Sequence, residues 1–260
     1  MEKELEGKTA LVTGSGRNLG RAIVLELAAR GAQVIVNSRA NLEEAESTAE
    51  VARELGAEAL VVVGDVSKQE TIDEIVARSA ERFGAVDISV SNAAIRPYQS
   101  FFDTPIEDWL RILDTQLNAS FRLAKAVVPG MVEKHWGRII HITGPDAFIG
   151  NANRAHNVTA KGGLRALTKS LAIELGPYGI TVNDVAPGAM DTERNELSHP
   201  HVTAGGPVEN DRERVIGQIP VGRLGTPEDL AYACGFLASP RAGFYTGTVM
   251  WCFGGQWIPA

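Results

Sequence analysis

The sequence predicts an α/β fold, with one doubly wound parallel sheet and helices on both faces. Short apolar runs alternate along the chain with longer amphipathic segments, which is typical of repeated βαβ units. The runs lack polar alternation, as expected of strands that helices cover on both sides. A chain of 260 residues with 44% hydrophobic and 22% charged residues can bury one such core. We therefore expect a single domain over residues 1–260.

Seven segments are expected to be strands, because each is a short run rich in Val, Ile or other apolar residues. They are Thr9–Thr13, Gln33–Asn37, Glu58–Val63, Val86–Asn92, Arg138–Thr143, Ile180–Val185 and Thr248–Trp251. Helical periodicity predicts helices between them, at residues 19–30, 41–55, 68–83, 107–134, 155–176 and 227–238. Parallel strands joined in this way end at one edge of the sheet, where ligands bind.

A polar segment at about residues 190–222 interrupts this alternation. A loop of this length in a compact domain is usually functional, and we expect it to be a lid over the substrate. The segment contains His199 and His201, but no fixed ligand spacing accompanies them. We therefore expect no metal site.

Composition narrows the class of partner. A formal net charge of −7 without a basic cluster argues against nucleic-acid binding and favours a small-molecule substrate. No apolar run reaches the roughly 18 residues needed to span a membrane. Cys234 and Cys252 are too few and too isolated for a disulfide framework. These features, with no signal peptide in the first residues, predict a cytoplasmic protein.

The motif "TGSGRNLG" (Thr13–Gly20) joins the first strand to the first helix. Glycines at such a turn let the backbone approach a pyrophosphate, which then lies on the helix N-terminus, as in a Rossmann fold. The candidate cofactor-binding residues of this turn are Gly14, Ser15, Arg17, Asn18, Leu19 and Gly20.

The end of the second strand predicts which dinucleotide is bound. An acidic residue there would bind a ribose 2′-hydroxyl and favour NAD(H). This chain has Ser38 and Arg39 instead, with Arg17 in the glycine turn. Two guanidinium groups suit a 2′-phosphate, so we expect NADP(H) to be preferred over NAD(H). The alternative is that both arginines are solvated surface residues.

Together with this turn, several motifs resemble the short-chain dehydrogenase/reductase family, and within it the 3-oxoacyl-carrier-protein reductase-like members. They are "TGSGRNLG", "GDVS", "SNAA", "VNDVAPGAMDT", "PVGRLGTPEDLA" and the late glycine pair Gly254–Gly255. The resemblance covers nearly the whole chain, although Asn18 replaces the middle glycine of the family's turn. It implies further cofactor-binding residues, namely Asp65, Val66, Asn92, Lys161, Pro187, Gly188 and Thr192.

The same resemblance implies a hydride-transfer site with a tyrosine, a serine, a lysine and an asparagine. Lys161 matches the lysine and Asn118 the asparagine, while Asn157 stands at the tyrosine position and Gly144 at the serine position. An amide can donate a hydrogen bond, but it cannot deliver a proton near neutral pH. The usual groups that activate a substrate oxygen are thus expected to be absent.

Other residues are candidates for activating the substrate oxygen or for binding the substrate. Asp146 can act as an acid or base or can be an ordinary loop residue, and His156 can titrate near neutrality or simply pack. Arg154 can polarise a carbonyl or form a surface ion pair. Tyr98 and Phe148 are expected to line an apolar or aromatic substrate pocket, although either can belong to the core.

Three functions remain open at this point. The first is an oxidoreductase of a small carbonyl or alcohol, with its proton relayed through water by Lys161 and Asn118. The second is a lyase, isomerase or hydrolase on the same fold that uses Lys161, His156 or Asp146. The third is a sensor that binds NADP(H) without turnover. The segments 107–134 and 155–176 resemble a pair of helices that this family packs between subunits, which implies a homotetramer or homodimer.

Overall fold

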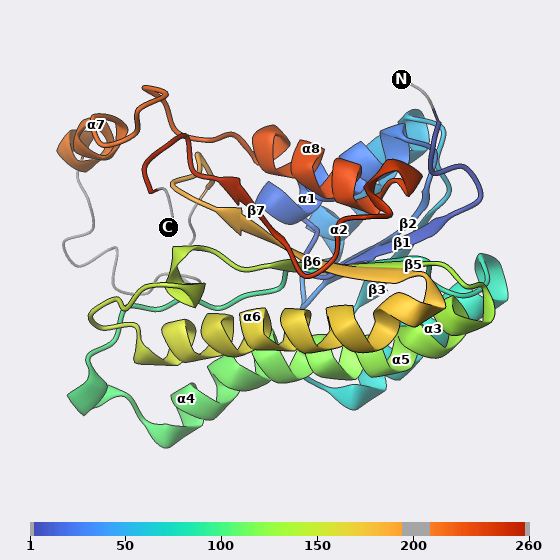
Figure 1. Ribbon diagram of the computed structural model, residues 1–260, viewed down its shortest axis with the longest axis horizontal. Helices are drawn as coiled ribbons and strands as arrows, with labels where there is room; N and C mark the ends of the chain where they lie inside the picture. Colours follow the sequence, from blue (N-terminus) through green and yellow to red (C-terminus); the bar gives the residue numbers. More distant parts are fainter. Residues whose placement is uncertain (1–2, 194–208, 258–260) are drawn as a thin grey trace.

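A single seven-stranded parallel sheet forms the centre of the molecule (Figure 1). The computed structural model describes residues 3–193 and 209–257. The strand order is β3-β2-β1-β4-β5-β6-β7. The strands are β1 (Thr9–Val12), β2 (Gln33–Ser38), β3 (Ala59–Val63), β4 (Ile88–Ser91), β5 (Gly137–Ile142), β6 (Ile180–Pro187) and β7 (Val249–Cys252). The order reverses between β1 and β4, which creates the switch point where such sheets bind ligands.

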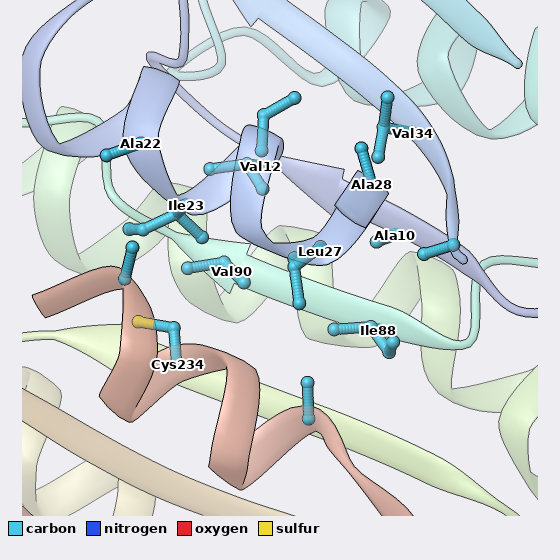
Figure 2. Packing of buried hydrophobic residues seen from close by; sticks show 14 of the residues in the cluster. Ala10, Val12, Ala22, Ile23, Leu27, Ala28, Val34, Ile88, Val90 and Cys234 are labelled. Atoms are coloured by element: carbon cyan, nitrogen blue, oxygen red, sulfur yellow. The ribbon is translucent and has the colours of Figure 1, made fainter. Parts of the chain in front are cut away.

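Helices cover both faces of the sheet, as the apolar strands require (Figure 1). One face carries α1 (Asn18–Ala29), α2 (Leu42–Glu54) and α8 (Pro227–Ala238). The other carries α3 (Gln69–Arg82), α4 (Ile106–Leu113), α5 (Ala119–Glu133) and α6 (Ala155–Leu175). Figure 2 shows the first of the two resulting cores, where Ile23 and Leu27 of α1 lie close to Ile88 and Val90 of β4 and Cys234 of α8.

The predicted fold class is confirmed, and the predicted strands and helices agree with the structure to within about two residues. The long helix expected at 107–134 has a feature that the periodicity does not reveal. A π-helical turn at Asp114–Asn118 joins α4 to α5 and changes which side chains face the site. Among the described residues, the helices are all too short or too polar to cross a membrane.

The expected lid is described only in part. Residues 190–193 follow β6, and the helix α7 (Glu209–Ile216), which the sequence pattern did not predict, occupies part of the remainder. Residues 194–208 lie outside the described residues, and His199 and His201 lie with them. The role of this segment as a substrate lid therefore stays a prediction.

Candidate active site

The turn between β1 and α1 has the backbone geometry that close approach of a phosphate requires. Gly14 has a φ of 61°, in the region that favours glycine. A Cβ on Gly20 would lie 2.7 Å from the Asn92 side chain, so only glycine fits at that position. Helix α1 starts after Arg17 without a side-chain cap, which leaves its first backbone N–H groups to be satisfied in another way. These groups suit an anion.

Three side chains hold this turn in place. The Asn92 side-chain amide donates to the carbonyl oxygens of Thr13 and Gly14, both at 2.9 Å. Asn37 accepts from the Gly14 N–H at 3.2 Å, and the buried Ser15 hydroxyl donates to the Val12 carbonyl at 2.7 Å. The ends of β1, β2 and β4 are thereby fixed to one another. Ser15 is buried, stabilises the turn through its hydrogen bonds and does not line the cavity.

A cavity of about 370 Å³ opens above this turn at the carboxyl edge of the sheet. Most of the predicted cofactor-binding residues line it. They are Gly14, Arg17, Asn18, Leu19, Gly20, Ser38, Arg39, Asp65, Val66, Asn92, Lys161, Pro187 and Thr192. Gly188 does not line the cavity, because it packs against Phe253, where a Cβ would lie 2.9 Å from the ring. The structure therefore gathers residues from most of the chain around one cleft.

The end of the cavity near β2 and β3 carries two arginines, Arg17 and Arg39. Arg39 is exposed at its rim, and Arg17 lies on the glycine turn, with its Nε 4.0 Å from a Glu44 carboxylate oxygen. The Ser38 hydroxyl accepts from the Asn41 N–H at 3.2 Å, and Asp65 accepts from the Ser67 N–H at 2.9 Å. Both arginines border the same space, so this end of the cavity is suited to a phosphate group.

Lys161 lies at the other end of the cavity and is almost completely buried. Its Nζ donates to the carbonyl oxygen of Ile142, at the end of β5, at 2.6 Å. Burial, followed by the positive charge of Arg96, lowers the pKa of Lys161 from 10.5 to about 7. A group with this pKa can gain and release a proton at neutral pH.

Asn157 stands one turn before Lys161 on α6, buried and held on both sides. Its carbonyl oxygen accepts from the Gln116 amide at 3.1 Å, and its own amide donates to the Asp146 carboxylate. Asp146 also forms an ion pair with Arg154, at 2.9 Å. The four residues thus form one connected group in which the Arg154 charge is paired with Asp146, although Gln116 Oε1 and Arg154 Nε have no hydrogen-bond partner among the described residues.

Gly144 precedes the short 3-10 turn Pro145–Ala147 that positions Asp146. Its φ is 129°, a backbone conformation that side chains with a Cβ rarely adopt, although the nearest atom to an added Cβ is the Pro187 carbonyl oxygen at 3.7 Å. Space is therefore available at this position, but the backbone favours glycine.

Of the predicted catalytic residues, Lys161 alone lines the cavity that the described residues form, whereas Asn157, Asp146, Asn118 and His156 do not. Asn118 is exposed, and its amide donates to the Asp114 carboxylate at 2.7 Å. The π-helical turn instead directs Gln116 to Asn157 and places Thr115 in the cavity wall. Gln116 was not among the candidates from the sequence, and in the structure it is a buried polar residue of this turn.

His156 also lies away from the cleft. It is fully buried and outside the cavity lining, and neither ring nitrogen has a hydrogen-bond partner among the described residues. Burial lowers its pKa below 6.5, and the charge of Arg154 adds to this effect. The structure thus supports the packing interpretation of His156 and not the role of an acid.

The aromatic candidates lie beside the site. Arg154 stacks on the Tyr98 ring at 4.7 Å and donates to its hydroxyl at 3.1 Å. Phe148 packs against Trp251 and Trp257, with ring centroids 4.5 and 5.8 Å away. Both side chains therefore already have partners, and they join the loops around the site to α6 and β7.

Sheet order, glycine turn and cleft together define a Rossmann-type α/β protein whose binding site lies at the switch point of the sheet. A family model described as Enoyl-(Acyl carrier protein) reductase matches residues 14–256. The chain belongs to the short-chain dehydrogenase/reductase family, a family of oxidoreductases.

Relatives of known activity cover the chain almost completely. It is 39% identical over 255 residues to the 3-oxoacyl-[acyl-carrier-protein] reductase FabG of Pseudomonas aeruginosa, which covers 98% of this chain and 99% of that protein. It is 36% identical to an L-rhamnose 1-dehydrogenase (NAD(P)(+)) of a Sphingomonas species, with 98% of both covered. A crystal structure of a short-chain type dehydrogenase/reductase from Mycobacterium marinum superposes with a TM-score of 0.87 at 32% identity, covering 99% and 98% of the two chains.

The lowered pKa of Lys161 predicts a measurable dependence of stability on pH. Between pH 7 and 10.5 the unfolded chain keeps this proton and the folded protein releases it, so stability rises with pH in that window. We expect wild type to gain about 2 kcal/mol relative to Lys161→Met between pH 7 and pH 9. Urea unfolding of both proteins at the two pH values measures this difference. A constant difference would show that Lys161 is an ordinary charged lysine.

Proposed function

We propose that the protein is an NADP(H)-dependent oxidoreductase of a small carbonyl or alcohol compound, with Lys161 as the source of the proton. The observation that carries this proposal is the position of Lys161, buried in the wall of the same cavity as the glycine turn. A basic group with a pKa of about 7 at that point supplies what Asn157 cannot.

The residues of the cavity fit the cofactor. The uncapped start of α1 and the glycine turn would receive the pyrophosphate, and Arg17 and Arg39 would bind a 2′-phosphate. When bound, NADPH supplies a hydride to the carbonyl carbon. The chain itself then has to provide a proton for the carbonyl oxygen.

Lys161 can meet this need. One N–H of its ammonium is committed to the Ile142 carbonyl, so two others are available to a substrate oxygen or to a water molecule. Gln116 and Asp146 hold the Asn157 amide between them, one helical turn before Lys161 on α6, although Asn157 itself does not line the cavity. Asn157 thus has a positioning role, and the proton moves between Lys161 and the oxygen.

A second function is favoured by the same group of residues. Asn157 bonds to Asp146, which pairs with Arg154, and none of the three lines the cavity, so none is positioned there to bind a substrate oxygen. A sensor that binds NADP(H) without turnover would not need a side chain positioned to bind a substrate oxygen. The non-redox enzymes receive less support, because His156 is buried outside the cleft and the Asp146 charge is paired. Measurement of turnover separates the two main candidates.

The preference for NADP(H) predicts a selective effect of Arg39. We expect Arg39→Ala to weaken NADPH binding about tenfold and to leave NADH binding nearly unchanged, because a charge-assisted contact to one phosphate is lost. Fluorescence titration with both cofactors measures this. Arg78→Ala, an exposed arginine of α3 paired with Glu74, is the control. An equal loss for both cofactors would contradict a 2′-phosphate site at Arg39.

The role of Lys161 predicts the pH dependence of turnover. With NADPH and a panel of small carbonyl compounds, we expect the rate of reduction to fall above about pH 7, as Lys161 loses its proton. Lys161→Arg keeps the charge but cannot release a proton, and its rate should fall about 100-fold or more without that pH dependence. Absorbance loss at the NADPH band is the measurement.

Two outcomes would decide against this mechanism. If Lys161→Arg keeps the wild-type pH profile, the proton comes from another group. If wild type binds NADPH but oxidises none of it with any compound between pH 5 and pH 9, the sensor function is supported. Titration of Lys161→Arg with NADPH checks that its cofactor site is intact.

We also propose a cytoplasmic homotetramer or homodimer that associates through α5 and α6. Phe121 on α5 is 49% exposed and Ile173 on α6 is 82% exposed, so both helices present apolar side chains to solvent. We expect wild type to sediment as an oligomer and Ile173→Glu to dissociate it. Leu42→Glu, at an exposed position of α2 on the other face of the sheet, should not. Wild type sedimenting as a monomer would contradict this assembly.

A further inference from the structure

Asn18 makes an unusual contact across the cofactor cleft. It is the first residue of α1 and has a φ of 49°, a left-handed conformation that asparagine tolerates better than most residues. Its Nδ2 donates to the carbonyl oxygen of Glu193 at 2.9 Å, and its Oδ1 accepts from the Glu193 N–H at 3.1 Å. One side-chain amide therefore pairs with both backbone groups of a single residue far along the chain.

The topology of the sheet shows how far this contact reaches. Asn18 follows β1, whereas Glu193 follows β6, and β4 and β5 lie between those strands in the sheet. β1 and β6 are thus three strand spacings apart in the sheet, a distance of about 14 Å. Residues 190–193 must therefore cross the carboxyl ends of β4 and β5 to meet Asn18, and this edge is where the cavity opens. Asn18, Thr192 and Glu193 all line that cavity.

Residues 190–193 are also held at their start. Met190 forms a β-bridge with Gly225, and the Asp191 N–H donates to the Gly225 carbonyl at 2.7 Å. Arg212 of α7 makes a two-point ion pair with the Asp191 carboxylate, at 2.8 and 2.6 Å. The segment is thus fixed beside the sheet at one end and tied to the glycine turn at the other.

We propose that Asn18 is a cofactor-retaining residue, whose amide fastens Thr192 and Glu193 over the dinucleotide. The inference rests on the proposed function, since it assumes that the cavity binds NADP(H). Asn18 is the first residue of α1, the helix whose N-terminus would receive the pyrophosphate. Release of the cofactor then requires both hydrogen bonds to Glu193 to break, so Asn18 slows dissociation.

Asn18→Gly tests this role with little disturbance of the turn, because glycine adopts a φ of 49° without strain. We expect NADPH to dissociate about tenfold faster from this variant, which corresponds to about 1.4 kcal/mol. Stopped-flow displacement of NADPH by excess NADP⁺ from the full-length protein measures the rate. His135→Gly makes the same kind of change at an exposed residue with a φ of 48°, at the turn before β5, and is the matched control.

Hydrogen exchange tests the contact itself without any cofactor. In wild type the Glu193 amide hydrogen is bonded to Asn18, so its exchange should be slow compared with that in Asn18→Gly. His135→Gly should leave this exchange unchanged. Equal exchange in wild type and Asn18→Gly would show that the contact does not persist in solution and would overturn the inference.

The dissociation experiment separates this inference from the proposed function. If wild type binds NADPH and Asn18→Gly releases it at the same rate or more slowly, Asn18 does not retain the cofactor and the inference fails alone. If wild type gives no NADPH binding at all, the proposed function fails and the inference falls with it. Faster release from Asn18→Gly but not from His135→Gly supports both.

Discussion

The site depends on the burial of the Lys161 amine against the end of β5. Its hydrogen bond to the Ile142 carbonyl requires α6 to lie close over β5 and β6, and other contacts hold the helix there. Thr168 and Arg165, on the same face of α6, bind the buried Asp184 of β6 at 2.6 and 3.0 Å. Because α6 is fixed in this way, the Lys161 amine is held at a depth where burial lowers its pKa.

Burial also shifts the pKa values of two side chains near Lys161, the acidic Asp184 and the basic His141. Burial raises the pKa of Asp184 to about 7, and burial lowers that of His141 to about 3. His141 is therefore neutral at neutral pH, and its Nδ1 lies 2.7 Å from the Thr168 hydroxyl. Loss of hydration thus dominates in all three groups, Lys161 included, and it opposes the charged form in each. The titration of Lys161 results from its depth in the fold rather than from one charged partner.

The fold and the cofactor end of the cleft were predictable from the sequence because they follow from local rules. Strand patterning and the glycine turn determine where Gly14, Gly20 and Asn92 must lie. The chemical end was less predictable, because it depends on helix geometry. The π-helical turn exposes Asn118 and brings Gln116 to Asn157, and no periodicity of the sequence marks it. The Asn18 contact with Glu193 also joins segments that no local pattern relates.

The two ends of the cleft are constrained in different ways. Residue types can therefore differ at the chemical end while the glycine turn at the cofactor end keeps its geometry. At the glycine turn the main constraint is on the backbone, and Asn18 meets it with a left-handed φ of 49°. The chemical end is built from side chains that fit one another. A serine at 144 would meet a φ of 129°, and a tyrosine at 157 would displace the contacts with Gln116 and Asp146. The backbone at Gly144 thus disfavours a serine, and the hydrogen bonds of Asn157 disfavour a tyrosine in its place. Lys161 lies at this chemical end, where burial and its hydrogen bond to the Ile142 carbonyl hold the amine in the cavity wall.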